Sequence, residues 1–419
     1  MNTYETYFAD LGQRARKASA SLALLTTEEK NQILEAVAQA LVDQSAAILE
    51  ANQKDLSLAE VHQVPSVMMD RLRLSQERIE QMAVGLRQLV DLADPVGRVL
   101  ETIERPNGLH IVKKSVPLGV VAMIYEARPN VTIDAAALSL KTGNAVILRG
   151  GKEAFQTNQV LVDCIRQVLA SLGYAEDAVQ LVTLLDREAV PVLLRQRQYI
   201  DVVIPRGGAG LIRRVVEESS IPVIETGSGV CHTYVDAQAD LEKAIPIIIN
   251  AKMQRPSVCN SMETLLVHKD IAGPCLEGLK AVLQDSGLRI HGNEEVAKSL
   301  ENVIPLTAQS FHTEYNDLDL NVKIVDSLDA AIDHITKHTT HHSEAIITED
   351  PVARDTFMNR IDASTVYVNA STRFTDGFEF GLGAEIGIST QKLHARGPMG
   401  LDVLTTYKYL VFGDGQIRQ

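Results

Sequence analysis

The residue whose type and setting point most directly to chemistry is Cys259, in the stretch QRPSVCNSMETLLV at 254–267. A cysteine beside apolar residues is most often a small buried hydrophobe, and that is the competing interpretation. Polar neighbours that a core thiol does not require crowd the same segment, namely Arg255, Ser257, Asn260 and Ser261. We therefore interpret Cys259 as a candidate nucleophile.

The elements around Cys259 place it on a connector. The segment 240–254 is predicted to be a helix, because its apolar residues recur at helical spacing. Pro256 cannot continue that helix, and Thr264–Val267 is predicted to be a buried strand. Since the carboxyl end of a helix disfavours a thiolate, activation must come from cations such as Lys252 or Arg255, from backbone N–H groups or from a bound cofactor.

Bulk properties bound the class of protein. A chain of 419 residues is too long for one ordinary core, so two or three domains are expected. Its 45% apolar content is typical of a soluble globular protein, and its net charge of -14 argues against nucleic-acid or anionic-membrane partners. No signal peptide, disulfide framework, zinc-site spacing or apolar run of about 18 residues is present in the sequence, so we expect a cytoplasmic protein.

The chain changes character along its length. Residues 1–95 are predicted to be helical, and Pro106-Asn107-Gly108 predicts a hairpin turn between two short strands. From Gly119 onward strands alternate with helices, which predicts a mostly parallel α/β sheet that binds ligands at the carboxyl ends of its strands. The predicted strands are Val120–Tyr125, Ala145–Arg149, Ala178–Leu184, Ile200–Pro205 and Val223–Glu225. A second α/β unit is expected after Cys259.

Two of these strands end in glycine-rich loops, Arg149-Gly150-Gly151-Lys152 and Arg206-Gly207-Gly208-Ala209-Gly210. Glycine allows close backbone approach, and a following helix presents unpaired N–H groups to phosphate. Neither loop matches the dinucleotide fingerprint, so a plain tight turn is the alternative for each. Together, in an acidic chain, they favour a phosphorylated cofactor. We prefer NADP (or NADPH) to NAD, because Arg149, Lys152 and Arg206 could contact its additional phosphate.

Several stretches resemble the aldehyde dehydrogenase superfamily: the Cys259 stretch, NAVILRGGKEA at 144–154, PLGVVAMIYEARPN at 117–130 and IETGSGVCHTYVD at 224–236. Within it, VDSLDAAIDHITKHTTHHSEAI at 325–346 and HARGPMGL at 394–401 resemble the gamma-glutamyl phosphate reductase family closely. The resemblance covers essentially the whole chain.

The resemblance implies an α/β, aldehyde-dehydrogenase-like fold, with two Rossmann-like α/β domains and a small β oligomerisation arm. The expected cofactor-binding domain comprises residues 1–100 and 117–225, and the expected catalytic domain comprises 226–399. Residues 101–116 and 400–419 would form the arm, with Thr405–Phe412 as its C-terminal strand. An arm of this kind mediates subunit contacts, so a homo-oligomer is expected.

The resemblance also assigns roles to the reacting end of the site. Cys259 would be the active-site cysteine, and Glu225 matches the carboxylate that activates water in hydrolytic members. Here Glu225 would carry a proton or only orient the site. Arg128 occupies the place of the oxyanion-site asparagine, and Asn130 lies two residues on. Either could donate to an oxyanion, and a structural ion pair is the alternative for Arg128.

Glu314 matches the superfamily position whose glutamate holds the nicotinamide ribose, with an exposed loop acid as the alternative. We interpret Arg373 and Arg396 as anchors for the carboxylate of an amino-acid substrate.

Other reactive residues received structural interpretations. His334, His338 and His341 could share a helix face and bind a metal, but Thr339-Thr340 breaks that helix and no acid or cysteine completes a ligand set, so no metal is expected. Cys231 and His232 are adjacent on a strand and point to opposite faces, so Cys231 is interpreted as packing.

The implied reaction is the NADPH-dependent reduction of L-glutamate 5-phosphate, in proline biosynthesis. Cys259 would displace phosphate to form a thioester, and hydride transfer would release glutamate 5-semialdehyde, which cyclises to 1-pyrroline-5-carboxylate. The chain is too short for a fused kinase, so glutamate 5-kinase would be a separate protein in transient contact. The alternatives are a hydrolytic semialdehyde dehydrogenase and a non-catalytic subunit of a proline-pathway assembly.

Overall fold

A computed structural model describes residues 3–283 and 286–418, which fold into two compact units. Unit 1 comprises Met1–Glu225, Gly381–Gly387 and Met399–Gln419, and unit 2 comprises Thr226–Phe380 and Ile388–Pro398. The segment 381–387 departs from the predicted division, which placed it with residues 226–399. It packs on unit 1, since a Cβ on Gly383 would lie 2.4 Å from the Leu92 side chain. Met399, which unit 1 also includes, exchanges backbone hydrogen bonds with Ile386 and Gly387 at 3.0 and 2.8 Å.

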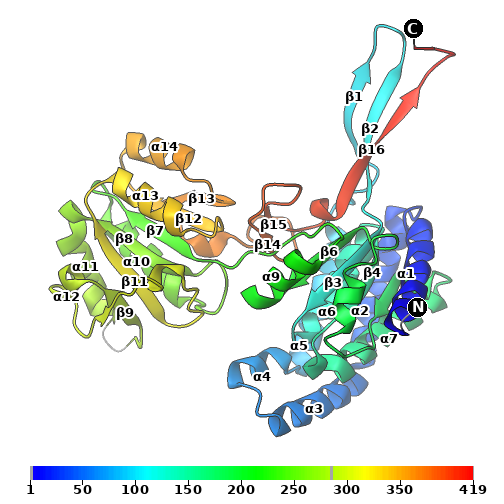
Figure 1. Cartoon of the computed structure of the whole chain (residues 1–419), viewed down its shortest axis with the longest axis horizontal. Helices are drawn as coiled ribbons and strands as arrows, with labels where there is room; N and C mark the ends of the chain where they lie inside the picture. Colours follow the sequence, from blue (N-terminus) through cyan, green and yellow to red (C-terminus); the bar gives the residue numbers. More distant parts are fainter. Residues whose placement is uncertain (1–2, 284–285, 419) are drawn as a thin grey trace. The chain divides into compact units, whose positions relative to one another are not determined.

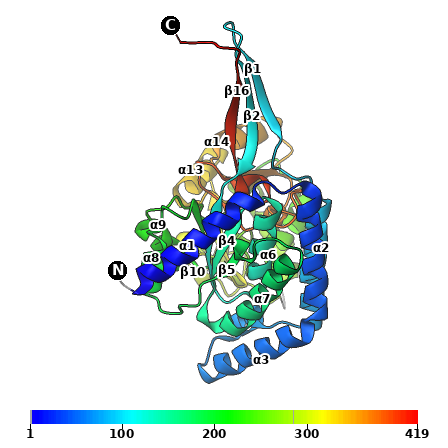
Figure 2. The same ribbon diagram turned by 90° about the vertical axis from the view of Figure 1, so that its right-hand side faces the viewer.

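Helices form the first part of unit 1 (Figures 1 and 2). Thr26 caps the second helix: its side chain accepts from the Glu29 N–H, and the Glu29 carboxylate accepts from the Thr26 N–H. The helices are α1 (Thr3–Leu22), α2 (Thr27–Asp43), α3 (Ser45–Val61), α4 (Ser66–Leu72) and α5 (Gln76–Asp91).

The sheet of unit 1 is parallel, in the order β5-β4-β3-β6. Its strands are β3 (Val120–Tyr125), β4 (Ala145–Arg149), β5 (Val179–Leu181) and β6 (Val202–Arg206), and its helices are α6 (Pro129–Lys141), α7 (Phe155–Ser171), α8 (Ala189–Leu193) and α9 (Ala209–Glu218). The predicted strand Val223–Glu225 is wrong. Only Val223 forms an isolated bridge, with Val203. The next bond of a parallel ladder toward Glu225 would need an N–H from residue 205 of β6, which is a proline and has none. The carboxyl ends of β3, β4 and β6 meet at one edge of the sheet.

An antiparallel arm extends from unit 1, as both views show (Figures 1 and 2). Its strands β1 (Val99–Glu104), β2 (His110–Pro117) and β16 (Thr405–Phe412) lie in the order β1-β2-β16. Gly108 takes a φ of +86° in the turn, which glycine adopts without strain. The predicted hairpin and the predicted strand Thr405–Phe412 are confirmed.

Unit 2 contains a parallel sheet in the order β10-β9-β11-β8-β7-β12-β13. These strands are β7 (Cys231–Val235), β8 (Met262–His268), β9 (Arg289–Gly292), β10 (Ile304–Pro305), β11 (Asp319–Val325), β12 (Ser343–Ile347) and β13 (Thr365–Val368). The helices are α10 (Leu241–Met253), α11 (Lys269–Leu283), α12 (Glu294–Ala297), α13 (Leu328–His338) and α14 (Pro351–Arg360), and a short pair β14 (Ile388–Ser389) and β15 (Gly397–Pro398) completes the unit. Every residue of β7, β8 and β12 is buried, as expected for parallel strands covered on both faces.

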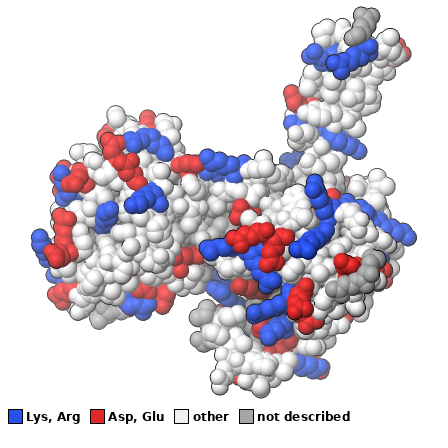
Figure 3. Space-filling model, in the orientation of Figure 1, with Lys and Arg blue, Asp and Glu red and all other residues white. Residues whose placement is uncertain are grey.

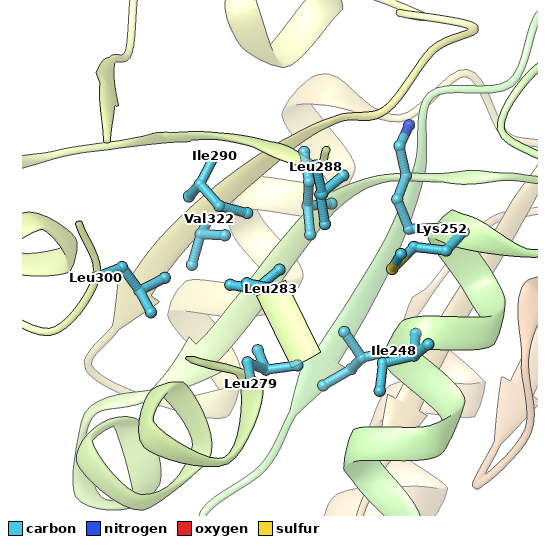
Figure 4. Close-up of a pocket in the computed structure, with 11 residues that line it drawn as sticks. Ile248, Lys252, Leu279, Leu283, Leu288, Ile290, Leu300 and Val322 are labelled. Carbon is cyan, nitrogen blue, oxygen red and sulfur yellow. The ribbon is translucent and has the colours of Figure 1, made fainter. Parts of the chain in front are cut away.

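The interior of unit 2 contains a buried ion pair beside a small apolar cavity (Figure 4). Apolar side chains of α10, α11 and the sheet line the cavity, among them Ile248 and Leu279. The nitrogen of Lys252 points away from them and lies 2.7 Å from a carboxylate oxygen of Glu263, with both side chains almost fully buried. Lys252 is therefore committed to Glu263, and the prediction that it stabilises a thiolate gains no support.

Charge is distributed in small groups of both signs on the face shown in Figure 3. The acidic side chains behind the net charge of -14 therefore do not gather into one large patch on this face. Within residues 3–283 and 286–418, no helix has the length and apolar character needed to cross a membrane.

Candidate active site

Cys259 lies on the turn that joins α10 to β8, and its side chain is only partly buried. The other cysteines of the chain, all described, are buried, and burial raises the pKa of Cys164 to about 11, that of Cys275 to about 12 and that of Cys231 well above its usual range. The thiolate is the nucleophilic form of cysteine, and burial disfavours it at the other three cysteines. Cys259, which is partly exposed, is therefore the cysteine best suited to covalent chemistry. The buried-hydrophobe interpretation of Cys259 does not hold.

The turn is held on both sides of the Cys259 peptide. The thiol of Cys231 donates to the carbonyl oxygen of Cys259 at 3.3 Å. The next residue, Asn260, is buried, and its amide donates to the Thr375 carbonyl at 2.8 Å. Its own carbonyl accepts from the Thr372 hydroxyl at 2.7 Å. Contacts from two separate segments of unit 2 therefore fix the backbone at and next to the candidate nucleophile.

The two candidate substrate-anchoring arginines occupy different surroundings within unit 2. Arg373 donates to the Gln254 side chain at 2.8 Å and to the side-chain oxygen of Asn260, and burial lowers the pKa of its guanidinium. Arg396 pairs with Asp362 at 2.6 Å. Arg373 thus lies at the nucleophile turn, where it also supports Asn260, whereas Arg396 is engaged in an ion pair. That either arginine anchors a substrate carboxylate stays a prediction.

Glu314 is connected to the same turn. One of its carboxylate oxygens accepts the backbone N–H of Gly229 at 3.0 Å. Gly229 in turn packs directly against Cys259, since a Cβ added to Gly229 would lie 1.4 Å from the Cys259 carbonyl oxygen. Gly229 thus connects Glu314 to the backbone of the candidate nucleophile, Cys259. Its role toward a ribose stays a prediction.

Unit 1 brings the two glycine-rich loops to one sheet edge. Arg149 pairs with Ile124, and Arg206 pairs with Tyr125, so both loops begin beside the end of β3. A Cβ on Gly150 would lie 2.3 Å from the Asn158 side chain, and one on Gly207 would lie 2.7 Å from the Glu126 side chain. Gly150 therefore has no room for a side chain, whereas at Gly207 the flexible Glu126 side chain could move aside. Both contacts are with the protein's own atoms, so they describe how the loops pack.

The three basic side chains at this sheet edge differ in how free they are to contact a cofactor phosphate. The guanidinium of Arg149 donates to the carbonyls of Gly150 and Leu185 at 2.5 and 3.0 Å, and burial lowers the pKa of Arg149. Arg149 therefore fastens its own loop. Lys152 is exposed, and Arg206 is partly buried near Asp134. Of the three predicted phosphate contacts, Lys152 and Arg206 are better disposed than Arg149.

The two candidate oxyanion donors lie at the start of α6. Arg128 is the N-cap residue with an extended backbone, and Asn130 follows in the first turn. The amide of Asn130 donates to Asp134 at 3.3 Å, and burial raises the pKa of Asp134 to about 6 against the opposing charge of Arg206. Glu225, partly buried, is the last residue of the first segment of unit 1. The choice between Arg128 and Asn130, and the role of Glu225, stay predictions.

The histidine-rich segment divides as the sequence predicted. Helix α13 ends at His338 with Thr339 as its C-cap, so the predicted helix break is confirmed and His341 is not on that helix. His338 and His312 lie 3.1 Å apart through ring nitrogens. Among the residues that the structure describes, no group of three or more histidine, cysteine or acidic side chains is arranged to bind a metal.

A model of the aldehyde dehydrogenase family matches residues 6–296 of this chain. The chain belongs to the aldehyde dehydrogenase family. It is 56% identical over 408 residues to the gamma-glutamyl phosphate reductase of Moorella thermoacetica, covering 97% of this chain and 98% of that one. It is 52% identical over 408 residues to the enzyme of the same name from Lactiplantibacillus plantarum, with 97% and 98% coverage. Within its family, the chain belongs with the gamma-glutamyl phosphate reductases.

Solved structures agree on the fold. A crystal structure of gamma-glutamyl phosphate reductase from Thermotoga maritima is 44% identical and matches with a TM-score of 0.96, over 98% of this chain and 100% of that one. An acetylating aldehyde dehydrogenase from Geobacillus thermoglucosidasius shares only 16% identity, with a TM-score of 0.69 over 99% and 98% of the two chains, and supports the fold alone. The predicted α/β, aldehyde-dehydrogenase-like fold is confirmed, and the chain is an oxidoreductase.

Family membership implies a nicotinamide cofactor, and the glycine-rich edge of unit 1 fits one. A cation stands on each loop, Lys152 on one and Arg206 on the other, and the Gly208 N–H at the start of α9 is bound by the Glu126 carboxylate at 3.0 Å. The carboxyl edge of a parallel sheet is also where such ligands bind in α/β folds.

Sequence reasoning missed several residues that shape the site. Gly229 lay within a quoted motif, and its need for glycine emerges only from its contact with Cys259. Cys231 was interpreted as packing, although its thiol donates to that same residue. Glu126 accepts the Gly208 N–H at 3.0 Å, at the start of α9. None of these contacts carries a spacing signal, because each joins distant parts of the chain.

Proposed function

We propose that this chain reduces L-glutamate 5-phosphate to L-glutamate 5-semialdehyde with release of phosphate, in proline biosynthesis. The observation that carries the proposal is the partly exposed Cys259, on a fixed turn, in a chain that is 56% identical to a gamma-glutamyl phosphate reductase. The product cyclises without an enzyme to 1-pyrroline-5-carboxylate.

In the proposed mechanism the Cys259 thiolate attacks the acyl carbon of the substrate and expels phosphate, which leaves a thioester. A backbone or side-chain donor, with Arg128 and Asn130 as candidates, stabilises the oxyanion that forms during attack. When bound, the reduced nicotinamide supplies a hydride to the thioester carbonyl. The resulting thiohemiacetal on Cys259 collapses, releases the aldehyde and regenerates the thiolate.

Glu225 has a different place in this scheme from the one it has in hydrolytic relatives. Activation of water would hydrolyse the thioester and waste the activated substrate. We therefore assign Glu225 to orienting the site or carrying a proton. A hydrolytic semialdehyde dehydrogenase is the rival function, since Glu225 occupies the position of the water-activating carboxylate in IETGSGVCHTYVD.

We assign NADPH as the cofactor in preference to NADH. The support is the pair of cations Lys152 and Arg206, one on each glycine-rich loop of an otherwise acidic chain. Arg149, Gly150, Gly207 and Gly208 would shape those loops, and Glu314 would hold the nicotinamide ribose. A carboxylate of the substrate would pair with Arg373 or Arg396.

The remaining parts of the proposal concern location and partners. The arm of β1, β2 and β16 would join subunits into a homo-oligomer, unit 2 would carry the catalytic chemistry, and the part of unit 1 outside the arm would bind the cofactor. Glutamate 5-kinase would deliver the activated substrate in a transient contact, in the cytoplasm.

The test is the reverse reaction, with 1-pyrroline-5-carboxylate as substrate and NADP or NAD as oxidant. We expect reduction of the nicotinamide that requires inorganic phosphate and is faster with NADP. Turnover that proceeds equally without phosphate would establish the hydrolytic rival. Equal kinetic constants with NAD and NADP would remove the assignment of the cofactor, and absence of turnover would leave the chain a non-catalytic subunit.

A further inference from the structure

A second cysteine of unit 2 is directed at the nucleophile turn without being a nucleophile itself. Cys231, the first residue of β7, is fully buried, and its thiol donates to the carbonyl oxygen of Cys259 at 3.3 Å. A ring nitrogen of His342 lies 3.8 Å from the same sulfur. A thiol that served only as packing would have no reason to face a peptide oxygen of the reactive residue.

The strand geometry explains why Cys231 points there. β7 pairs with β8 in parallel, but the register shifts between Cys231 and His232, whose partners are Met262 and Thr264. An irregularity of this kind re-aims a side chain, and such features recur next to active sites. His232 turns instead to Glu344, at 3.0 Å, so the two adjacent residues serve different parts of the unit.

The same short segment packs against the nucleophile at a second point. Gly229, two residues before Cys231, approaches the Cys259 carbonyl so closely that an added Cβ would lie 1.4 Å from that oxygen. The N–H of Gly229 is itself held by Glu314 at 3.0 Å. The segment 229–231 therefore fixes one peptide oxygen by a donor and by close packing.

The charge state of Cys231 suits a permanent donor. Burial, reinforced by the nearby Glu344 carboxylate, raises the pKa of Cys231 well above its ordinary value. The thiol therefore keeps its proton at the pH at which Cys259 would react, and it neither competes as a nucleophile nor leaves the carbonyl without its partner.

We propose that Cys231 is a positioning residue for the Cys259 nucleophile, acting through the hydrogen bond from its thiol to the Cys259 carbonyl oxygen. This deepens the proposed function and rests on it for the chemistry at Cys259. Loss of the bond frees the peptide plane of Cys259 to rotate, which moves the sulfur relative to the guanidinium of Arg373, whose charge interacts with Cys259. Displacements of about 1 Å at a reacting group cost on the order of a hundredfold in rate.

The test compares three variants of the full chain. Cys231→Ala removes the donor, Cys231→Val removes it while filling the volume, and Cys231→Ser restores an O–H donor at the same place. Cys164→Ala is the matched control, because Cys164 is equally buried in α7 of unit 1 and is not part of the proposed site.

Two quantities are measured: the pH profile of Cys259 alkylation by iodoacetamide, resolved by peptide mass spectrometry, and kcat with KM in the phosphate-dependent reverse reaction. We expect Cys231→Ala and Cys231→Val to shift the alkylation profile of Cys259 to higher pH and to lower kcat about tenfold with KM little changed, the effect of one lost hydrogen bond. Cys231→Ser should recover most of both, and Cys164→Ala should alter neither.

Unchanged alkylation and kcat in Cys231→Val or Cys231→Ala would overturn the proposal, and so would a Cys231→Ser variant as impaired as these two. If one non-donor variant does not fold, the other supplies the comparison. Alkylation of Cys259 does not require turnover, so it tests the positioning role separately from the reaction. Failure of the proposed function would appear instead as full activity of Cys259→Ser.

Discussion

At the scale of single residues, the account depends on how firmly the peptide of Cys259 is held. Its carbonyl is bound by Cys231, and the following residue, Asn260, is bound by Thr372 and Thr375. Cys259, the proposed nucleophile, is itself only partly buried, so a held backbone carries a residue that is not sealed in the core. Preorganisation of this kind lowers the cost of reaching the reactive geometry.

Gly229→Ala tests the close packing against Cys259. The added methyl group would lie 1.4 Å from a backbone oxygen, which cannot turn aside as a flexible side chain could. We expect turnover to fall at least about a hundredfold, because the nucleophile turn must move. Gly273→Ala is the control: a Cβ on Gly273 in α11 meets no atom within 4 Å, and this variant should keep its activity. Equal activity of the two variants would contradict the described packing.

Lys152→Ala tests the assignment of the additional cofactor phosphate. Lys152 is exposed at the end of the glycine-rich loop that follows β4, and a charge-assisted contact to phosphate is among the stronger hydrogen bonds. We expect the KM for NADPH to rise about tenfold or more, with little change for NADH. Lys54→Ala, which removes an exposed lysine of α3, should change neither constant. A parallel loss with both cofactors would assign Lys152 to another role.

The sequence allowed some of these residues to be found and concealed others. Cys259 was identifiable because its polar neighbours and Pro256 are local features of the chain. The partners of Lys252 and Cys231 were not, because Glu263 and the Cys259 carbonyl reach them only after the sheet of unit 2 has formed. Contacts of this kind depend on strand register, which no short motif encodes.

At the scale of elements, helix α13 buries ionisable side chains that the mechanism does not use. His334 is 5% exposed, and its Nδ1 lies 3.0 Å from the ammonium of Lys323. Burial, with the charge of Lys323 beside it, lowers the pKa of His334 to about 2. The imidazole is therefore neutral in the folded protein, whereas in the unfolded chain it takes up a proton near its ordinary pKa.

This difference predicts sensitivity to acid. Because the folded pKa is depressed, the stabilisation is complete above about pH 6.5 and declines as the pH falls below that value. At about pH 5.5 the loss from His334 alone is about 1.4 kcal/mol in the free energy of unfolding. We expect the thermal midpoint to fall more between about pH 7.5 and 5.5 in the unsubstituted chain than in His334→Asn, whose amide oxygen can still accept from Lys323. Identical shifts in both would contradict the assignment.

Elements with strong local signals were predicted well. The hairpin at Pro106-Asn107-Gly108 and the end of α13 at Thr339 follow from turn and capping chemistry. The strand expected at Val223–Glu225 and the membership of 381–387 in unit 1 were not predictable, because each depends on pairing with a distant segment.

At the scale of the whole molecule, the arm presents apolar side chains that the described chain does not cover. Tyr407, Tyr409 and Val411 are each at least 50% exposed along β16. An edge of this kind invites another chain, which agrees with the proposed subunit contact.

Tyr409→Asp combined with Val411→Asp tests that contact. We expect the pair to convert the oligomer to single chains, measured by light scattering after size exclusion, because two charges would be buried in an apolar interface. Leu58→Asp on α3, which is 54% exposed, is the control and should leave the assembly intact. An unsubstituted protein that already has the mass of one chain, or a double variant with unchanged mass, would refute the proposed role of the arm.

The central claim is that Cys259 carries the acyl group between two chemical steps. The most direct measurement is rapid mixing of the enzyme with 1-pyrroline-5-carboxylate and NADP without phosphate, followed by nicotinamide absorbance. The account predicts a burst of about one reduced nicotinamide per chain, which stops until phosphate is added, and no burst in Cys259→Ser. A burst of the same size in Cys259→Ser, or steady turnover without phosphate in the unsubstituted enzyme, would contradict it.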